Sequence, residues 1–133
     1  MSVRIVRLGS LRAGDEGLRI GAVRRPPRGV PKSEFASRHY YDVWMPLLSP
    51  TPELVAQAKA ATTQAQWSRF LRKFRAQMSR DDSARLLDLL AALSRTANFS
   101  VGCYCEDESH CHRSVLRHLL EERGADMTAL TPP

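Results

Sequence analysis

The chain has 133 residues, of which 43% are hydrophobic and 26% are charged. These values are ordinary for a globular protein and argue against a disordered chain, a collagen, a coiled coil or a disulfide scaffold. Lys and Arg number 20 against 14 Asp and Glu, and the net charge of +6 favours an anionic partner without identifying it. The length predicts one domain, which we place at residues 1–124, followed by a flexible tail at residues 125–133.

Targeting signals are absent from the sequence pattern. No apolar run approaches the roughly 18 residues of a membrane-spanning helix. Residues 1–7 alternate charged and apolar side chains, which is unlike the apolar core of a signal peptide. We therefore expect a cytoplasmic protein with no membrane partner.

The first 50 residues predict two short strands and a stiff loop. Alternating apolar residues predict a strand over residues 3–8 and a second over residues 18–23. Three prolines within residues 26–31 end the second strand and make the following loop rigid. A short helix over residues 33–37 is expected next, and then an irregular or briefly extended stretch to residue 50.

Helices dominate the middle of the chain. Thr51, Pro52 and Glu53 are typical of a helix start, and this helix should run to about Ala61. The sequence from Thr63 to Gln66 fits a capping box and predicts a second helix. That helix carries an apolar stripe at helical spacing, formed by Trp67, Phe70, Leu71, Phe74 and Met78.

The last third of the chain predicts a helix, a strand and a final helix. The helix begins near Asp81, and the strand covers Phe99–Tyr104. The final helix runs from about Cys111 to Arg123 and ends at Gly124. Strands separated by helices favour an α/β fold, so we predict a small, mostly parallel sheet flanked by helices in a single domain.

Chemistry-bearing residues concentrate between Cys103 and Arg113. This segment holds all three cysteines of the chain and two of its four histidines. An odd number of cysteines cannot form a complete intramolecular disulfide framework, and thiols gathered in a reducing compartment indicate a site. The segment joins the end of a predicted strand to the start of a helix, where ligands bind in open α/β sheets and where backbone N–H groups favour anions.

Three chemistries are open for this segment. In the first, Cys105 or Cys111 is a reactive thiolate, with Glu106 or His112 as the proton-transfer group. In the second, the segment binds a metal ion through Cys105, His110 and Cys111, the set of ligands that we favour. In the third, the helix start binds an anion or a nucleotide.

The third reading needs cationic side chains, and the sequence offers two groups of them. His112 and Arg113 lie at the predicted helix start, and Arg24 and Arg28 lie in the stiff loop after the second strand. A structural reading also stays open. In that reading Cys103 is a small buried apolar residue, Arg113 pairs with Glu106 across the loop, and the thiols have no chemical role.

The positive charge is unevenly distributed. Residues 1–45 hold nine basic and four acidic residues, so they carry most of the net charge. If the two strands that precede the basic loop and the Cys/His segment are parallel neighbours, both loops meet at one edge of the sheet. A shared pocket would then have Arg28, Arg113 and Cys105 in its wall.

Three segments resemble the YeaO-like family of bacterial proteins, domain of unknown function 488. They are Arg24–Lys32 with its Pro-Arg-Gly-Val sequence, Tyr41–Pro50 together with Trp67-x-x-Phe70, and Val101–Leu120 with its Cys-Glu and Cys-His-Arg sequences. The chain departs from the family pattern at Pro26, where an aromatic residue is often found. The resemblance covers roughly residues 3–124 and implies a compact α/β fold, with no particular activity or cofactor.

Together these observations favour a small protein with a site for an anionic small molecule or a nucleotide, formed by residues 24–32 and 105–113. Two alternatives remain. One is a nucleic-acid-binding module without catalysis, although no helix-turn-helix, zinc-finger or RNA-binding motif supports it. The other is a metal-binding or thiol-based redox-sensing protein.

Overall fold

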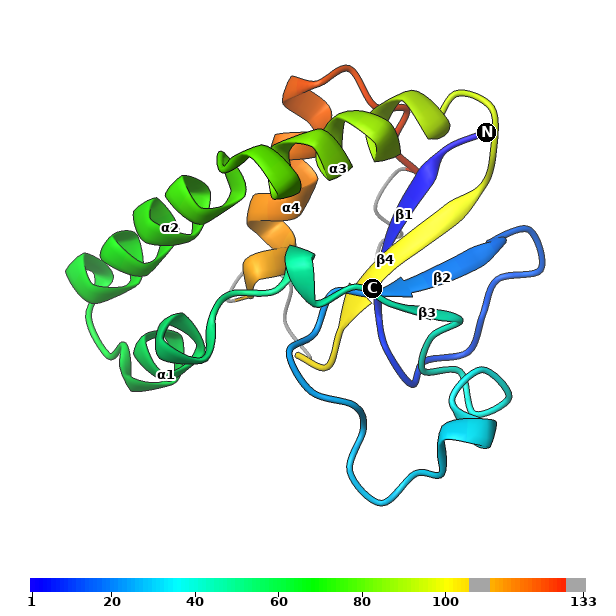
Figure 1. Cartoon of the computed structure of the whole chain (residues 1–133), viewed down its shortest axis with the longest axis horizontal. Helices are drawn as coiled ribbons and strands as arrows, with labels where there is room; N and C mark the ends of the chain where they lie inside the picture. Colours follow the sequence, from blue (N-terminus) through cyan, green and yellow to red (C-terminus); the bar gives the residue numbers. More distant parts are fainter. Residues whose placement is uncertain (106–110, 129–133) are drawn as a thin grey trace.

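The computed structural model describes residues 1–105 and 111–128. Within them the chain forms four strands, two short 3-10 helices and four α-helices (Figure 1). The strands are β1 (Val3–Arg7), β2 (Leu18–Gly21), β3 (Val43–Trp44) and β4 (Phe99–Cys103). The 3-10 helices are η1 (Lys32–Glu34) and η2 (Pro46–Leu48). The α-helices are α1 (Pro52–Ala60), α2 (Gln64–Met78), α3 (Asp81–Leu93) and α4 (His112–Glu122).

The strands form one sheet in the order β1-β4-β2-β3, and every neighbouring pair is parallel. The predicted α/β class is therefore confirmed. The last strand, β4, lies between the first two, and all five of its residues are buried. Central strands of parallel sheets are covered on both faces, which explains why β4 carries no charged residue.

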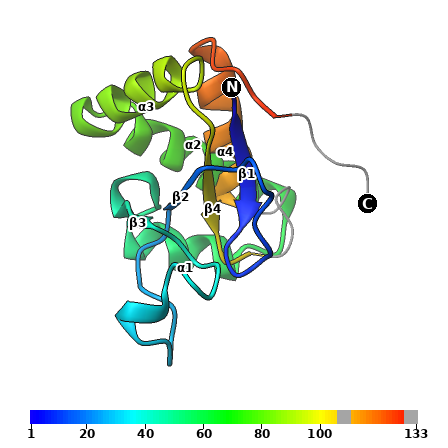
Figure 2. The same ribbon diagram turned by 90° about the vertical axis from the view of Figure 1, so that its right-hand side faces the viewer.

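One face of the sheet packs against the helices. Val3, Ile20, Phe99 and Val101 alternate along their strands so that their side chains share this face. They join one buried core with apolar residues of the helices, among them Phe70, Phe74, Leu87, Leu90, Leu116 and Leu120. Figure 2 shows α2 and α3 together on one side of β1 and β4.

Loops rather than helices cover the opposite face. Tyr41 lies so close to Gly21 that a Cβ added at this glycine would be 2.5 Å from the tyrosine ring. Arg19 is on the same face and is fully buried, at 0% exposure. Its guanidinium donates to the Glu16 carboxylate through Nε at 2.7 Å and Nη2 at 2.9 Å.

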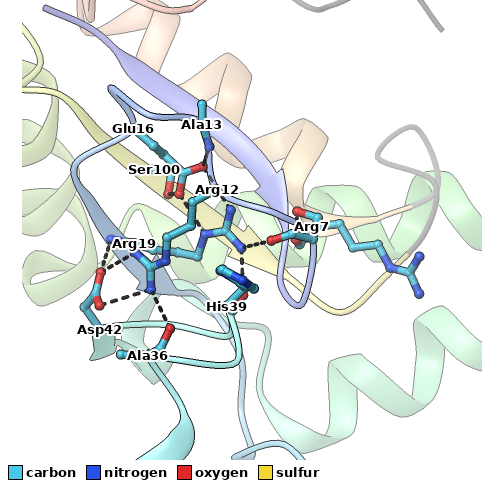
Figure 3. A network of polar contacts seen from close by, with 10 residues as sticks. Arg7, Arg12, Ala13, Glu16, Arg19, Ala36, His39, Asp42 and Ser100 are labelled. Atoms are coloured by element: carbon cyan, nitrogen blue, oxygen red, sulfur yellow. Dashed lines mark hydrogen bonds and ion pairs between the residues drawn. The ribbon is translucent and has the colours of Figure 1, made fainter.

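The Arg19 guanidinium also joins two loops to the sheet. Its Nη1 donates to the carbonyl oxygens of Ser10, at 2.9 Å, and His39, at 2.7 Å (Figure 3). Ser100 of β4 donates to the Glu16 carboxylate at 2.8 Å. Burial by itself would raise the pKa of the Glu16 carboxyl, but the hydrogen bonds from Arg19 and Ser100 outweigh it and hold this pKa below its usual value.

The element boundaries agree closely with the sequence analysis and differ at the ends. The capping box of α2 is present, since Thr63 accepts from the Gln66 backbone N–H and Gln66 accepts from the Thr63 N–H. The region predicted as a helix over residues 33–37 forms only η1. No helix in the described ranges is both long and apolar enough to cross a membrane.

The end of the chain differs from the expected tail. The Val3 N–H donates to the Asp126 carbonyl and the Thr128 N–H donates to the Val3 carbonyl, each at 2.8 Å. Residues 126–128 therefore pair with the start of β1, and the ordered domain extends past residue 124. The remainder of the predicted tail, residues 129–133, lies outside the described residues.

Candidate functional site

The loops that follow β2 and β4 leave the same edge of the sheet, because the two strands are parallel neighbours. A cavity of about 680 Å³ opens there, and we call it the edge cavity. Its lining comes from the chain after β2, the end of β4, the first residue of α4, and α1 and α2. The carboxyl edge of a parallel sheet is where ligands bind in this class of fold. The volume suits a ligand of nucleotide size.

The edge cavity has a cationic lining. Arg25, Arg28 and Lys59 belong to it, and all three are exposed. Arg24 also lines the cavity, but it donates to the carbonyl oxygens of Pro50, at 3.1 Å, and Ser49, at 2.9 Å. Arg24 therefore fixes the basic loop against the chain before α1, whereas Arg25, Arg28 and Lys59 are exposed.

The lining of the cavity also contains cysteines. Cys103, Cys105 and Cys111 form what we call the thiol cluster. The sulfur atoms of Cys103 and Cys111 are 2.8 Å apart, and both of these residues are buried. The sulfur of Cys105 forms hydrogen bonds with both of them, and Cys105 is exposed. Cys103 and Cys105 line the edge cavity, so the cluster is reached from solvent through Cys105.

The three thiols differ in how readily they ionise. Hydrogen bonds from Cys103 and Cys111 lower the pKa of the Cys105 thiol, helped by the nearby Arg113 charge. The hydrogen bond to Cys105 raises the pKa of Cys103, as do the contact with Cys111 and burial. For Cys111, the hydrogen bond with Cys103 lowers the pKa. The hydrogen bond with Cys105 and burial act in the opposite direction, and the pKa of Cys111 is raised overall. The arrangement supports one thiolate, on Cys105, beside two neutral thiols.

His112 begins α4 and lines the cavity beside the thiol cluster. Its Nε2 is 2.8 Å from the Ala22 carbonyl oxygen, and its Nδ1 is 3.6 Å from the Cys111 sulfur. Because a carbonyl can only accept, Nε2 carries the proton and Nδ1 is left as an acceptor. Burial lowers the pKa of His112 to about 4, so the ring is neutral at pH 7. An edge-to-face contact with the Phe74 ring, with the ring centroids 5.5 Å apart, also holds the imidazole in place.

Arg113 is buried, at 3% exposure, and does not line the edge cavity. Its Nη2 donates to the Cys105 carbonyl oxygen at 2.6 Å. Its Nε has no hydrogen-bond partner among the residues that the structure describes. Arg113 therefore holds the backbone of Cys105 in place and supplies a buried positive charge beside the thiol cluster.

The structure brings together most of the residues that the sequence singled out. Arg24, Arg28, Cys105 and His112 line one cavity, and Cys111 lies against it in the thiol cluster. Arg113 does not line the cavity but donates to the carbonyl oxygen of Cys105, which does. Glu106 and His110, expected as a proton-transfer group and a metal ligand, lie outside the described residues.

Three contributors were not among the predicted site residues. Cys103 belongs to the thiol cluster; its position two residues before Cys105 predicts that both point to the same face of a strand, but a buried apolar role was favoured for it. Arg25 lines the cavity next to Arg24, and the sequence places it in the same stiff basic loop. Lys59 comes from α1, and no local pattern connects that helix to the Cys/His segment.

The all-parallel sheet, with a cation-lined cavity and a thiol cluster at its carboxyl edge, defines a small α/β protein with the features of a ligand site. The chain belongs to the DUF488-N3a family, since the model described as "Active DUF488-N3 subclade" matches residues 3–124. No curated protein and no solved structure matches the chain. The match agrees with the family resemblance noted in the sequence.

Proposed function

We propose that the protein is an enzyme that binds a small anionic molecule of nucleotide size in the edge cavity and reacts with it through the Cys105 thiol. The observation that carries this proposal is the composition of one cavity, whose lining includes an exposed cysteine and three exposed cationic residues. The word "Active" in the description of the matching family agrees with a catalytic role.

The charges favour an anionic ligand. Arg25, Arg28 and Lys59 supply three cations to the lining of the cavity, and none of the lining residues is acidic within the described ranges. Arginine binds phosphate and carboxylate groups through paired N–H donors. Tyr104 donates to the Arg25 carbonyl oxygen at 2.8 Å, so the basic loop is tied to the chain that carries Cys105.

The remaining wall suits a less polar part of the same ligand. Val55, Trp67 and Phe70 line the cavity from α1 and α2. The Trp67 and Phe70 rings contact each other, with centroids 5.0 Å apart. A cavity lined by both aromatic and cationic side chains fits a molecule with both a flat ring and an anionic group, and a nucleotide has both.

Cys105 is the side chain that we assign to the reaction. Cys105 is an exposed residue and its sulfur accepts hydrogen bonds from two neighbouring thiols, which is the arrangement that supports a nucleophile. The sulfur would attack an electrophilic atom of the bound anion, and the leaving group would depart with the bonding electron pair. Water would then release the product and restore the thiol. His112 faces Cys111 rather than Cys105, so we assign it to holding Cys111.

Alkylation of the metal-free protein by iodoacetamide, followed by peptide mass spectrometry, tests this proposal. Cys105 should be modified first, and ATP should slow its modification. Arg28→Ala should raise the ATP concentration needed for half protection about tenfold, the effect of losing roughly 1.4 kcal/mol. Arg72→Ala removes the same charge from an exposed position of α2 outside the cavity and should change nothing.

Two results would contradict the proposal. One is faster modification of Cys103 or Cys111 than of Cys105, because the reactive thiol would then be a buried one. The other is a rate at Cys105 that neither ATP nor inorganic phosphate changes at millimolar concentration, because the cavity would then not bind anions of this class.

A further inference from the structure

We propose that the thiol cluster and His112 form a binding site for a thiophilic divalent metal ion such as Zn²⁺. Cys103, Cys111 and His112 would be three of the ligands, and Cys105, whose sulfur lies outside this close group, would turn toward the ion to take the fourth position at the wall of the edge cavity. The inference goes beyond the proposed function, because it requires neither a substrate nor a reaction.

The positions of the ligand atoms carry the inference. The sulfur atoms of Cys103 and Cys111 and a ring nitrogen of His112 all lie within 4.8 Å of one another. In a tetrahedral zinc site, bond lengths of about 2.3 Å to sulfur and about 2.0 Å to nitrogen place two sulfurs roughly 3.8 Å apart and a sulfur and a nitrogen roughly 3.6 Å apart. The Cys111 sulfur and His112 Nδ1 are 3.6 Å apart.

The two buried sulfurs are closer than this geometry requires. Cys103 and Cys111 have their sulfur atoms 2.8 Å apart, and an ion between them would separate these atoms by about 1 Å. One of these residues ends β4 and the other is the N-cap of α4, so both are held by hydrogen-bonded elements. A rotation about the side-chain bonds gives the extra distance without moving either element.

His112 is oriented as a metal ligand usually is. Histidines that bind metals donate their second ring N–H to a carbonyl or carboxylate, which fixes the tautomer and turns the other nitrogen to the ion. The Ala22 carbonyl accepts from Nε2 at 2.8 Å, and Nδ1 faces the Cys111 sulfur. Cys111 and His112 are adjacent in sequence, and their ligand atoms are therefore close enough to bind the same ion.

The charges also balance. Zn²⁺ with three thiolates and a neutral imidazole has a net charge of −1, and a buried negative charge needs a nearby positive one. Arg113 is buried and donates to the Cys105 carbonyl at 2.6 Å, while its Nε has no partner among the described residues. Its positive charge would neutralise the site.

This ligand set differs from the one expected from sequence. That set combined Cys105 and Cys111 with His110, which lies outside the described residues. The structure offers His112 instead, and the two histidines make a direct comparison possible. His118, on the same helix with its side chain 63% exposed, provides a control that removes an imidazole elsewhere.

The test is a titration of the full, metal-free chain with Zn²⁺ in competition with a chromophoric chelator, repeated with Co²⁺ as a spectroscopic probe. One ion should bind per chain, and the Co²⁺ complex should show thiolate-to-metal charge transfer. His112→Asn and Cys111→Ser should each weaken Zn²⁺ binding at least 100-fold, and Cys105→Ser about 10-fold. His110→Asn and His118→Asn should bind Zn²⁺ as the unaltered chain does.

A measurement on the unaltered chain covers the case in which a variant fails to fold. Saturating Zn²⁺ should protect Cys103 and Cys111 from alkylation, as seen by mass spectrometry. Absence of a bound ion, absence of this protection, or loss of binding in His110→Asn but not in His112→Asn would each overturn the proposal. Unchanged affinity in Cys105→Ser would also overturn it as stated. Because no substrate or activity is involved, failure here is distinct from failure of ATP protection in the metal-free protein.

Discussion

Two groups of polar side chains are buried in this small domain, and they differ in how completely their atoms are paired. Around Arg19, the Glu16 carboxylate, Ser100 and two backbone carbonyls supply close partners for the guanidinium and the acid. Around the thiol cluster, two sulfurs lie 2.8 Å apart, and the Nε of buried Arg113 has no partner among the described residues. The second group borders the edge cavity through Cys103 and Cys105.

The difference separates a structural network from a candidate site. Buried charges are tolerated where each is paired and hydrogen-bonded, and such networks hold loops in place. A buried group that lacks partners costs free energy. In the described part of the chain, such atoms are the Nδ1 of His39, the hydroxyl of Tyr41 and the Nε of Arg113, and of these Arg113 lies beside the thiol cluster at the edge cavity. The Arg19 group therefore fixes the loops on one face of the sheet, and the thiol cluster is where binding and chemistry are expected.

The largest effect should come from breaking the Arg19 network. Glu16→Ala removes the carboxylate and leaves the fully buried Arg19 guanidinium without its charge partner. We expect the free energy of unfolding, measured by urea denaturation, to fall by about 3–5 kcal/mol. Asp15→Ala removes a neighbouring acid whose side chain is 77% exposed in its pair with Arg4, and should change stability by less than about 1 kcal/mol. Equal losses of unfolding free energy in the two variants would show that the buried ion pair of Glu16 with Arg19 does not stabilise the fold more than an exposed pair does.

Acid should weaken the same network without deleting a side chain. The pKa of Glu16 is lower in the folded protein than its usual value of 4.5, so above that value the unfolded and folded states are both ionised and the stabilisation is complete. As the pH falls below it, the unfolded state takes up the proton first, and stability decreases. Urea denaturation at a series of pH values should show a steeper loss in the unaltered chain than in Glu16→Gln. If the unfolding free energy fell equally with pH in the unaltered chain and in Glu16→Gln, the pH dependence could not be assigned to Glu16.

Sequence reasoning predicted the fold well because the relevant signals are local. The capping box at Thr63, the proline after Thr51 and the alternation in Val3–Arg7 each fix an element through neighbouring residues. The site was located for a related reason, since the cysteines and two histidines lie close together in the sequence. The Arg19 network was not predicted: Glu16 is only three residues from Arg19, but Ser10, His39 and Ser100 come from separate segments that only folding brings together.

The smallest effect on stability should come from the residue with the largest proposed role in chemistry. Cys105 is exposed, so Cys105→Ser in the metal-free protein should change the free energy of unfolding by no more than about 0.5 kcal/mol. Cys103→Ser makes the same exchange of sulfur for oxygen at a position with 1% exposure, and should cost about 1–3 kcal/mol because it buries a hydroxyl among apolar neighbours. A thiol that can be replaced without loss of stability, beside two that cannot, is what a reactive or ligating cysteine on a rigid support requires. Equal losses in both variants would instead make Cys105 part of the packing, and the contrast between the two buried groups would no longer separate structure from function.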